Sequence, residues 1–172
     1  GLAHYIIHAY DVPALAPKAL KAANSYAGIA PAVPHALHMP SHTFTRVGYW
    51  QDSVTGNIKS AELAEKTNGY AEAMHARDYM TYAYLQMGMD TQARANLEHS
   101  MRLSTMKGGV QGAAGATNAF AQAAVPARFA MERQQWAEAM ALTPTPAPSS
   151  PYTEAITHFA RAIGAARSGQ PD

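Results

Sequence analysis

The chain repeats a pair of histidines at a fixed interval, and this repetition constrains the fold more than any other feature of the sequence. His4 and His8 stand four residues apart, and His38 and His42 follow 34 residues later with the same spacing. Similarity of a sequence to itself at an interval of about 20–50 residues is typical of folds built from stacked repeats. We therefore expect a row of similar units in which equivalent side chains take equivalent places.

The composition favours helices in these units. Alanine is abundant and β-branched residues are sparse, which suits helices that pack closely through small side chains rather than strands. With 172 residues, of which 48% are hydrophobic, the chain can bury a continuous core. The expected fold class is all-α.

Proline and glycine divide the expected helices into pairs. Proline suits the first turn of a helix and glycine suits the residue after its end, so Pro17, Pro34 and Gly48 mark boundaries. The expected helices span residues 2–10 and 17–28, 34–46 and 50–66, 70–87 and 90–103, 118–133 and 135–142, and finally 152–168. They define units at about 1–31, 32–68, 69–106 and 116–143, with a partial unit at 151–172.

Two stretches between these helices are expected to be irregular. Residues 104–117 are rich in glycine and are expected to form a loop, and residues 143–151 carry too many prolines for a helix. The helix expected at 152–168 has no second helix after it, which leaves an apolar face uncovered in an array of repeats. Since the chain also begins at Gly1 without an initiator methionine, we expect it to be part of a longer protein.

Small residues recur at equivalent places in the second helices of the expected pairs. They are Ala19, Ser53, Ala93 and Ala139, at intervals of 34, 40 and 46 residues. Together with the alternation of helix pairs and with Pro31 after the first pair, they make the chain resemble the tetratricopeptide repeat (TPR) superfamily. The resemblance implies a single domain, a TPR-like α-solenoid of stacked antiparallel helix pairs, in which the first helix of each pair lines a concave groove.

A more specific string lies at residues 35–42, which read HALHMPSH. It is similar to a segment of a bacterial subgroup of TPR-like proteins that carries an HMPSH-like motif. That similarity implies a fold and a groove, and it supplies no reaction. Pro40 lies inside the expected helix and removes one backbone donor, so we expect a kink between His38 and His42.

Polar residues of the first helices are the candidate binding residues. In a TPR-like fold, side chains one turn apart on these helices point into the groove, so the two histidine pairs share one trough. The repeat alignment places Asp78 and Tyr82 of the third unit at the positions of His38 and His42. The candidate groove residues are His4, His8, His35, His38, His42, Arg46, His75, Asp78 and Tyr82.

The two histidine pairs also form a candidate metal site. Two histidines one helical turn apart direct two nitrogens to one point, and neutral imidazole is the commonest metal ligand. The segment from His4 to His8 lacks the glutamate of a zinc-protease motif, so Asp78 is the candidate acid or base of a catalytic site. The candidate ligands are His4, His8, His38 and His42, for Zn²⁺, Cu²⁺, Ni²⁺ or Fe²⁺.

Two functions remain open. The interpretation that the sequence favours is a TPR-like scaffold that recognises a protein, a peptide or a small ligand in the histidine-lined groove. The alternative is a metal-binding protein or a metal-dependent enzyme that uses the four candidate ligands. No reaction follows from the sequence.

Charge and hydropathy exclude two classes of partner. Thirteen basic and twelve acidic residues leave a net charge of +1 without a basic cluster, so nucleic acid is not an expected partner. No apolar run approaches the roughly 20 residues of a membrane-spanning helix. The absence of cysteine excludes thiolate metal ligands and leaves the compartment of the protein open.

Overall fold

The fold is helical throughout the part of the chain that the structure describes. The computed structural model describes residues 1–106, 114–147 and 150–170, and in these ranges it contains helices and no strand, which confirms the expected all-α class. Among these residues, no helix has both the length and the apolar character needed to cross a membrane. The helices are α1 (Leu2–Ala9), the 3-10 helix η1 (Ala16–Ala19), α2 (Leu20–Ile29), α3 (Pro34–His38), α4 (Pro40–Val47), α5 (Trp50–Lys66), α6 (Tyr70–Gln86), α7 (Asp90–Ser104), α8 (Ala114–Glu132), α9 (Trp136–Met140) and α10 (Tyr152–Arg167).

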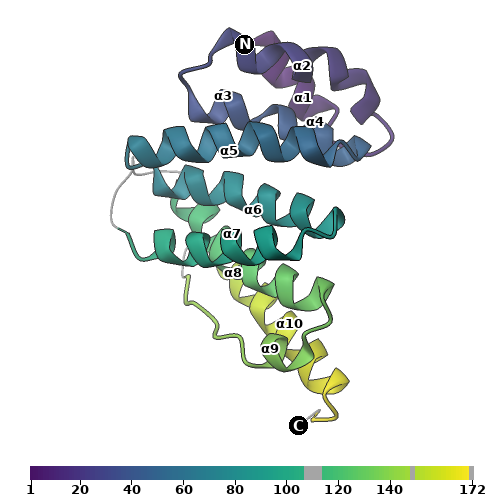
Figure 1. Cartoon of the computed structure of the whole chain (residues 1–172), viewed down its shortest axis with the longest axis vertical. Coiled ribbons are helices and arrows are strands. Elements are labelled where there is room, and N and C mark those ends of the chain that lie inside the picture. The colour runs from purple at the N-terminus through teal and green to yellow at the C-terminus, as the bar shows by residue number, and fades with distance from the viewer. Residues whose placement is uncertain (107–113, 148–149, 171–172) are drawn as a thin grey trace.

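Successive helices lie one beside the next from the N-terminal end of the molecule to the C-terminal end (Figure 1). α5 packs against α3 and α4 on one side and against α6 on the other, and α6 packs against both α7 and α8. The first helices of neighbouring units also meet, because α1 contacts α4, α3 and α4 contact α6, and α6 contacts α8. The helices that carry the candidate ligands are therefore neighbours in space.

The turn inside the helix pair has the same backbone conformation in three units. Gly48, Gly88 and Gln134 have positive φ values of 79°, 69° and 53°. In each turn the amide of the next residue bonds to the carbonyl five residues earlier, as from Tyr49 to Phe44 at 2.9 Å, which is the pattern of a Schellman cap. Glycine reaches this conformation without steric cost, so two of the three turns have a sequence signal and the turn at Gln134 has none.

The small residues that recur in the second helices are all buried. Ala19, Ser53, Ala93 and Ala139 each have 0% of their surface exposed. Small side chains at these places let the two helices of a pair approach closely. Their equivalence along the chain stays a prediction from the sequence, to which this shared burial is the expected accompaniment.

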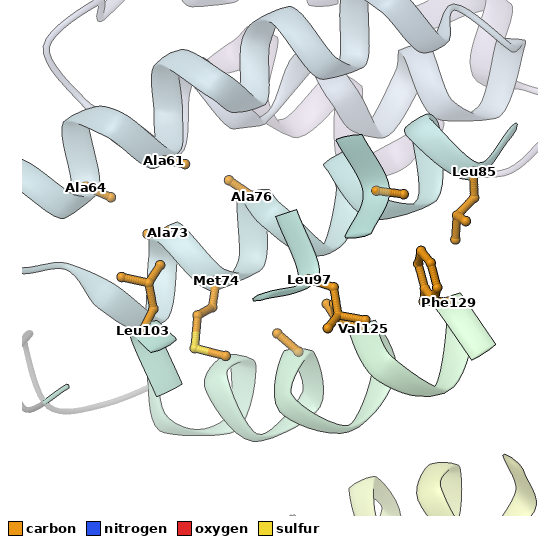
Figure 2. Packing of buried hydrophobic residues seen from close by; sticks show 12 residues of the cluster. Ala61, Ala64, Ala73, Met74, Ala76, Leu85, Leu97, Leu103, Val125 and Phe129 are labelled. Carbon is orange, nitrogen blue, oxygen red and sulfur yellow. The ribbon is translucent and has the colours of Figure 1, made fainter. Parts of the chain in front are cut away.

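The largest hydrophobic cluster lies between α5, α6, α7 and α8 (Figure 2). Alanines, among them Ala61 of α5 and Ala76 of α6, fill the narrow space between those two helices (Figure 2). Larger side chains fill the space between α6, α7 and α8: Met74, Leu85, Leu97, Leu103, Val125 and Phe129. Because close-packed cores resist deformation, α6 and the polar residues it carries are held in fixed positions.

The helix expected over residues 34–46 is divided at Met39 into α3 and α4. Pro40 has no amide hydrogen, so the carbonyl of Ala36 lacks its helical partner. The division falls between His38 and His42, where we expected a kink.

One expectation for the C-terminal half needs correction. α8 begins at Ala114, so the end of the predicted loop at 104–117 is helical, while residues 107–113 of that loop lie outside the described residues. The last helix, α10, packs against the two helices that precede it, α8 and α9. This contact is close, because a Cβ atom added at Gly164 would lie 2.5 Å from the backbone nitrogen of Met140.

Candidate metal centre

Six of the eight histidines gather in two groups of three on neighbouring helices. The outer trio comprises His4 and His8 of α1 and His35 of α3, and the inner trio comprises His38 of α3, His42 of α4 and His75 of α6. In each trio three ring nitrogens, one from each residue, lie within 4.8 Å of one another. Each trio therefore offers three nitrogen ligands to a single metal ion.

The sequence prediction combined the two histidine pairs in one ligand set, and the structure groups them differently. The grouping follows the ring nitrogens, which lie within 4.8 Å of one another in each trio, and the two trios adjoin where the ring centroids of His8 and His42 are 5.5 Å apart. Each pair is completed by a histidine from the next unit, because α3 lies beside α1 and α6 lies beside α3 and α4. His35 completes the outer pair in this way. The two trios are adjacent sites rather than one four-histidine site.

His38 is almost fully buried, with 2% of its surface exposed, and Asn57 holds its ring. The Nδ1–H group of His38 donates to Oδ1 of Asn57 at 2.7 Å. That oxygen faces the ring because the amide nitrogen of Asn57 donates to the backbone carbonyl of Ser53 at 2.8 Å. With the proton on Nδ1, Nε2 of His38 carries a lone pair.

An acidic residue orients the second imidazole of the inner trio. The Nδ1–H group of His42 donates to Oδ2 of Asp11 at 2.9 Å, and the hydroxyl of Tyr79 lies 3.1 Å from the same nitrogen. Arg46 in turn holds Asp11, through its Nε at 2.7 Å. Nε2 of His42 therefore carries a lone pair as well, and it lies 3.1 Å from Nε2 of His38. Two lone pairs that face each other repel unless a proton or a cation lies between them.

Burial disfavours a proton between these nitrogens. It holds the pKa of His38 well below the ordinary value, and the neighbouring His75 and His42 lower that pKa further. Burial, with smaller contributions from His42 and His35, lowers the pKa of His75 to about 4. The pKa of His42 is also lowered, because burial outweighs the opposing effect of Asp11. The inner trio is therefore neutral near pH 7, the form in which imidazole binds a metal.

The ring nitrogens of the outer trio also lie close together, but fewer hydrogen bonds among the described residues hold these rings in place. Nε2 of His4 lies 3.1 Å from Nε2 of His35 and 3.2 Å from Nε2 of His8. His8 and His35 are exposed. The carboxylate of Glu72 lies 4.0 Å from Nδ1 of His35, which is beyond hydrogen-bonding distance. Within the described part of the chain, the outer rings have no hydrogen-bonded carboxylate or amide like those behind the inner trio.

A cavity of about 260 Å³ borders the inner trio. It brings the predicted groove residues Arg46, Asp78 and Tyr82 together with two histidines of the trio. The residues that line it are His42, Thr45, Arg46, His75, Asp78, Tyr79, Tyr82, Phe120 and Arg128.

Asp78, the candidate acid or base, is paired with Arg128 at the wall of this cavity. Its side chain is buried, with 4% of the residue exposed, and it forms an ion pair with the guanidinium of Arg128. Burial raises the pKa of Asp78, and Arg128 opposes that rise. The carboxylate therefore also holds Arg128 at the cavity wall.

Four residues that hold the site were not identified from the sequence: Asp11, Asn57, Tyr79 and Arg128. Tyr79 carried a local signal, because it lies one helical turn after His75. Arg128 reaches Asp78 from 50 residues further along the chain, so no local pattern connects the two.

The two remaining histidines, His99 and His158, lie outside both trios. Nε2 of His99 lies 3.0 Å from Oε2 of Glu65, and His158 is exposed on α10. Neither belongs to a group of three potential ligands among the described residues.

Comparison with known proteins assigns no function: no protein-family model, no curated protein and no solved structure matches the chain. The resemblance to TPR-like proteins stays a prediction from the sequence.

Proposed function

We propose that this protein binds a divalent transition-metal ion through His38, His42 and His75. The observation that carries the proposal is the distance of 3.1 Å between Nε2 of His38 and Nε2 of His42, whose other ring nitrogens bond to Asn57 and Asp11. Metal–nitrogen bonds of about 2.0–2.1 Å place ligand nitrogens about 3.3–3.4 Å apart in a tetrahedral site and about 2.9 Å apart in an octahedral one. The separation in the inner trio falls between these values, so an ion fits with little movement of the two rings.

The hydrogen bonds behind the inner trio support the same proposal. Metal-binding histidines typically donate their other N–H group to a carboxylate or a carbonyl, which fixes the tautomer and the orientation of the ring. Asp11 accepts this bond from His42, and the side-chain carbonyl of Asn57 accepts it from His38.

Three imidazole ligands restrict the metal to ions that bind nitrogen well, but they do not select one ion. Imidazole nitrogens suit Zn²⁺, Cu²⁺, Ni²⁺ and Fe²⁺, and all four remain candidates. Three protein ligands leave a coordination position for water or for a substrate, which is typical of catalytic rather than structural zinc sites. The proposal therefore includes a metal-dependent enzyme, and the class of reaction is not assigned.

We place this site on a TPR-like α-solenoid. The recurring turns at Gly48, Gly88 and Gln134 support that architecture. Recognition of a protein or peptide in the groove, which the sequence favoured, ranks second. The reason is geometric. The ring nitrogens of each trio are close enough together to bind one ion, and the polar residues beside the inner trio line a cavity too small for a peptide.

Isothermal titration calorimetry on the full chain tests the proposal. After treatment with a chelator, we expect one Zn²⁺ or Ni²⁺ ion to bind tightly per chain, and we expect His75→Ala to lose this site. His158→Ala is the matched control, because His158 lies outside both trios and should bind as the unmodified chain does. Equal binding by the two variants, or no tight binding by the unmodified chain, would contradict the proposal.

A further inference from the structure

We infer that the cavity beside the inner trio binds a small molecule through an oxyanion group, which takes the open coordination position of the metal. This inference rests on the proposed metal site and names the class of ligand that the site would take. It is carried by the position of the cavity, by its donors and by its charge.

The cavity lies where a metal-bound ligand would be. Two of the three proposed ligands, His42 and His75, line its wall, while the third, His38, is buried with 2% of its surface exposed. An ion held by the three rings therefore has its accessible side toward the cavity. The volume of about 260 Å³ suits a molecule of few atoms rather than a peptide.

Hydrogen-bond donors predominate among the polar groups of the cavity. In the described part of the chain, Arg46 bonds to Asp11 through Nε, and Arg128 bonds to Asp78 through one terminal nitrogen. The other guanidinium N–H groups remain available for a ligand, as does the phenol of Tyr82. The one carboxylate in the wall, that of Asp78, is engaged by Arg128. Such a wall suits a ligand rich in acceptors, and guanidinium groups match the geometry of carboxylate and phosphate.

The charges lead to the same ligand class. Asp11 and Asp78 balance Arg46 and Arg128, so the wall and the neutral imidazoles carry no net charge before metal binding. A divalent cation then leaves two positive charges beside a partly enclosed space, where an anion is strongly favoured. Phe120 and the ring of Tyr82 supply apolar wall for a short carbon chain.

The test uses the full chain loaded with Co²⁺, whose visible absorption bands respond to a change in the ligands of the metal. Acetate and inorganic phosphate are the two anionic probes, and acetamide is the neutral control. We expect a saturable change in the spectrum with at least one anion and none with acetamide. A response to acetate alone would assign a carboxylate, and a response to phosphate alone would assign a phosphate.

Tyr82→Phe separates the cavity from the metal site, because Tyr82 lines the cavity and, among the described residues, forms no hydrogen bond with those that hold the three histidines. The variant should keep its Co²⁺ affinity within about threefold and lose about tenfold in anion affinity, because one hydrogen-bond donor to a charged group is removed. Tyr152→Phe is the matched control, since Tyr152 is exposed and does not line the cavity. The inference is overturned if Co²⁺ binds and no anion changes its spectrum, or if both variants bind anions as the unmodified chain does. Failure of Co²⁺ to bind overturns both this inference and the proposed function.

Discussion

The two histidine trios have the same number of ligands and similar nitrogen separations, but they differ in what surrounds them. In the inner trio, His38 is buried and His42 is partly buried, and the two rings are oriented by Asn57 and Asp11. In the outer trio, His8 and His35 are exposed, and the rings have no equivalent partners among the described residues. The comparison shows that the spacing of histidines sets where ligands converge, while the residues behind them set how firmly they are held.

This difference predicts two classes of metal affinity. In the folded protein, hydrogen bonds already fix the tautomer and orientation of His38 and His42, so metal binding costs little further conformational entropy. His8 and His35 are exposed, so more rotamer freedom has to be lost when an ion binds to the outer trio, which reduces the affinity. We therefore expect a tight inner site and a weaker outer site.

The largest effect should come from removing one ligand of each trio. His75→Ala should lower the affinity of the tight site by more than about 100-fold, since the loss of a ligand exceeds the 10–100-fold typical for its supporting residues. His35→Ala should leave the tight site unchanged and affect only the weaker one. Competition titration with a chromogenic chelator measures both. The reverse ranking of the two variants would show that the roles of the trios are exchanged.

The next effect concerns the residues behind the rings. Asp11→Ala should lower the affinity of the tight site about 10–100-fold, because His42 then loses the acceptor that fixes its tautomer. Glu72→Ala removes the corresponding carboxylate beside the outer trio. That group lies 4.0 Å from Nδ1 of His35, so its loss should change the affinity of either site by less than about threefold. The same titration measures both variants. If both variants lost the same affinity, the residues behind the inner trio would hold their rings no more firmly than those near the outer trio.

Thermal unfolding gives a smaller and independent effect. At a free Zn²⁺ concentration of about 100 times the dissociation constant, binding to the folded state adds about 2.7 kcal/mol to the free energy of unfolding. For a chain of this size we expect the melting temperature to rise by about 5–10 °C. His75→Ala should abolish most of this rise, and His8→Ala should preserve it. A rise that survives His75→Ala would place the stabilising ion elsewhere.

The smallest effect is the acid sensitivity of the metal-free protein. His75 lies beside the rings of His38, His42 and Tyr79, and burial, with smaller contributions from His42 and His35, lowers its pKa from 6.5 to about 4 in the folded state. The unfolded state therefore binds more protons between these two values, so the free energy of unfolding should fall as the pH falls from 6.5 to about 4. His75→Gln should flatten this dependence, as measured by urea unfolding at several pH values. An unchanged slope would show that His75 is not the group responsible.

The helices and the general position of the site follow from local patterns, whereas the division into two trios does not. The glycines at 48 and 88 and the recurring small residues mark helix ends and contacts, because both are set by local backbone geometry and side-chain size. The repeat interval also predicts that the candidate groove residues lie near one another, as they do in the structure. The grouping depends on how α3 lies beside α1 and α6, which no local pattern specifies. The same holds for Asp78, whose partner Arg128 comes from a distant helix.

Anomalous diffraction at the zinc absorption edge, from crystals of the full chain soaked in Zn²⁺, locates the bound ion directly. We expect a strong peak about 2.0–2.1 Å from one ring nitrogen each of His38, His42 and His75, and a weaker peak at the outer trio. No peak at the inner trio, or a stronger peak among His4, His8 and His35, would contradict the proposed metal site.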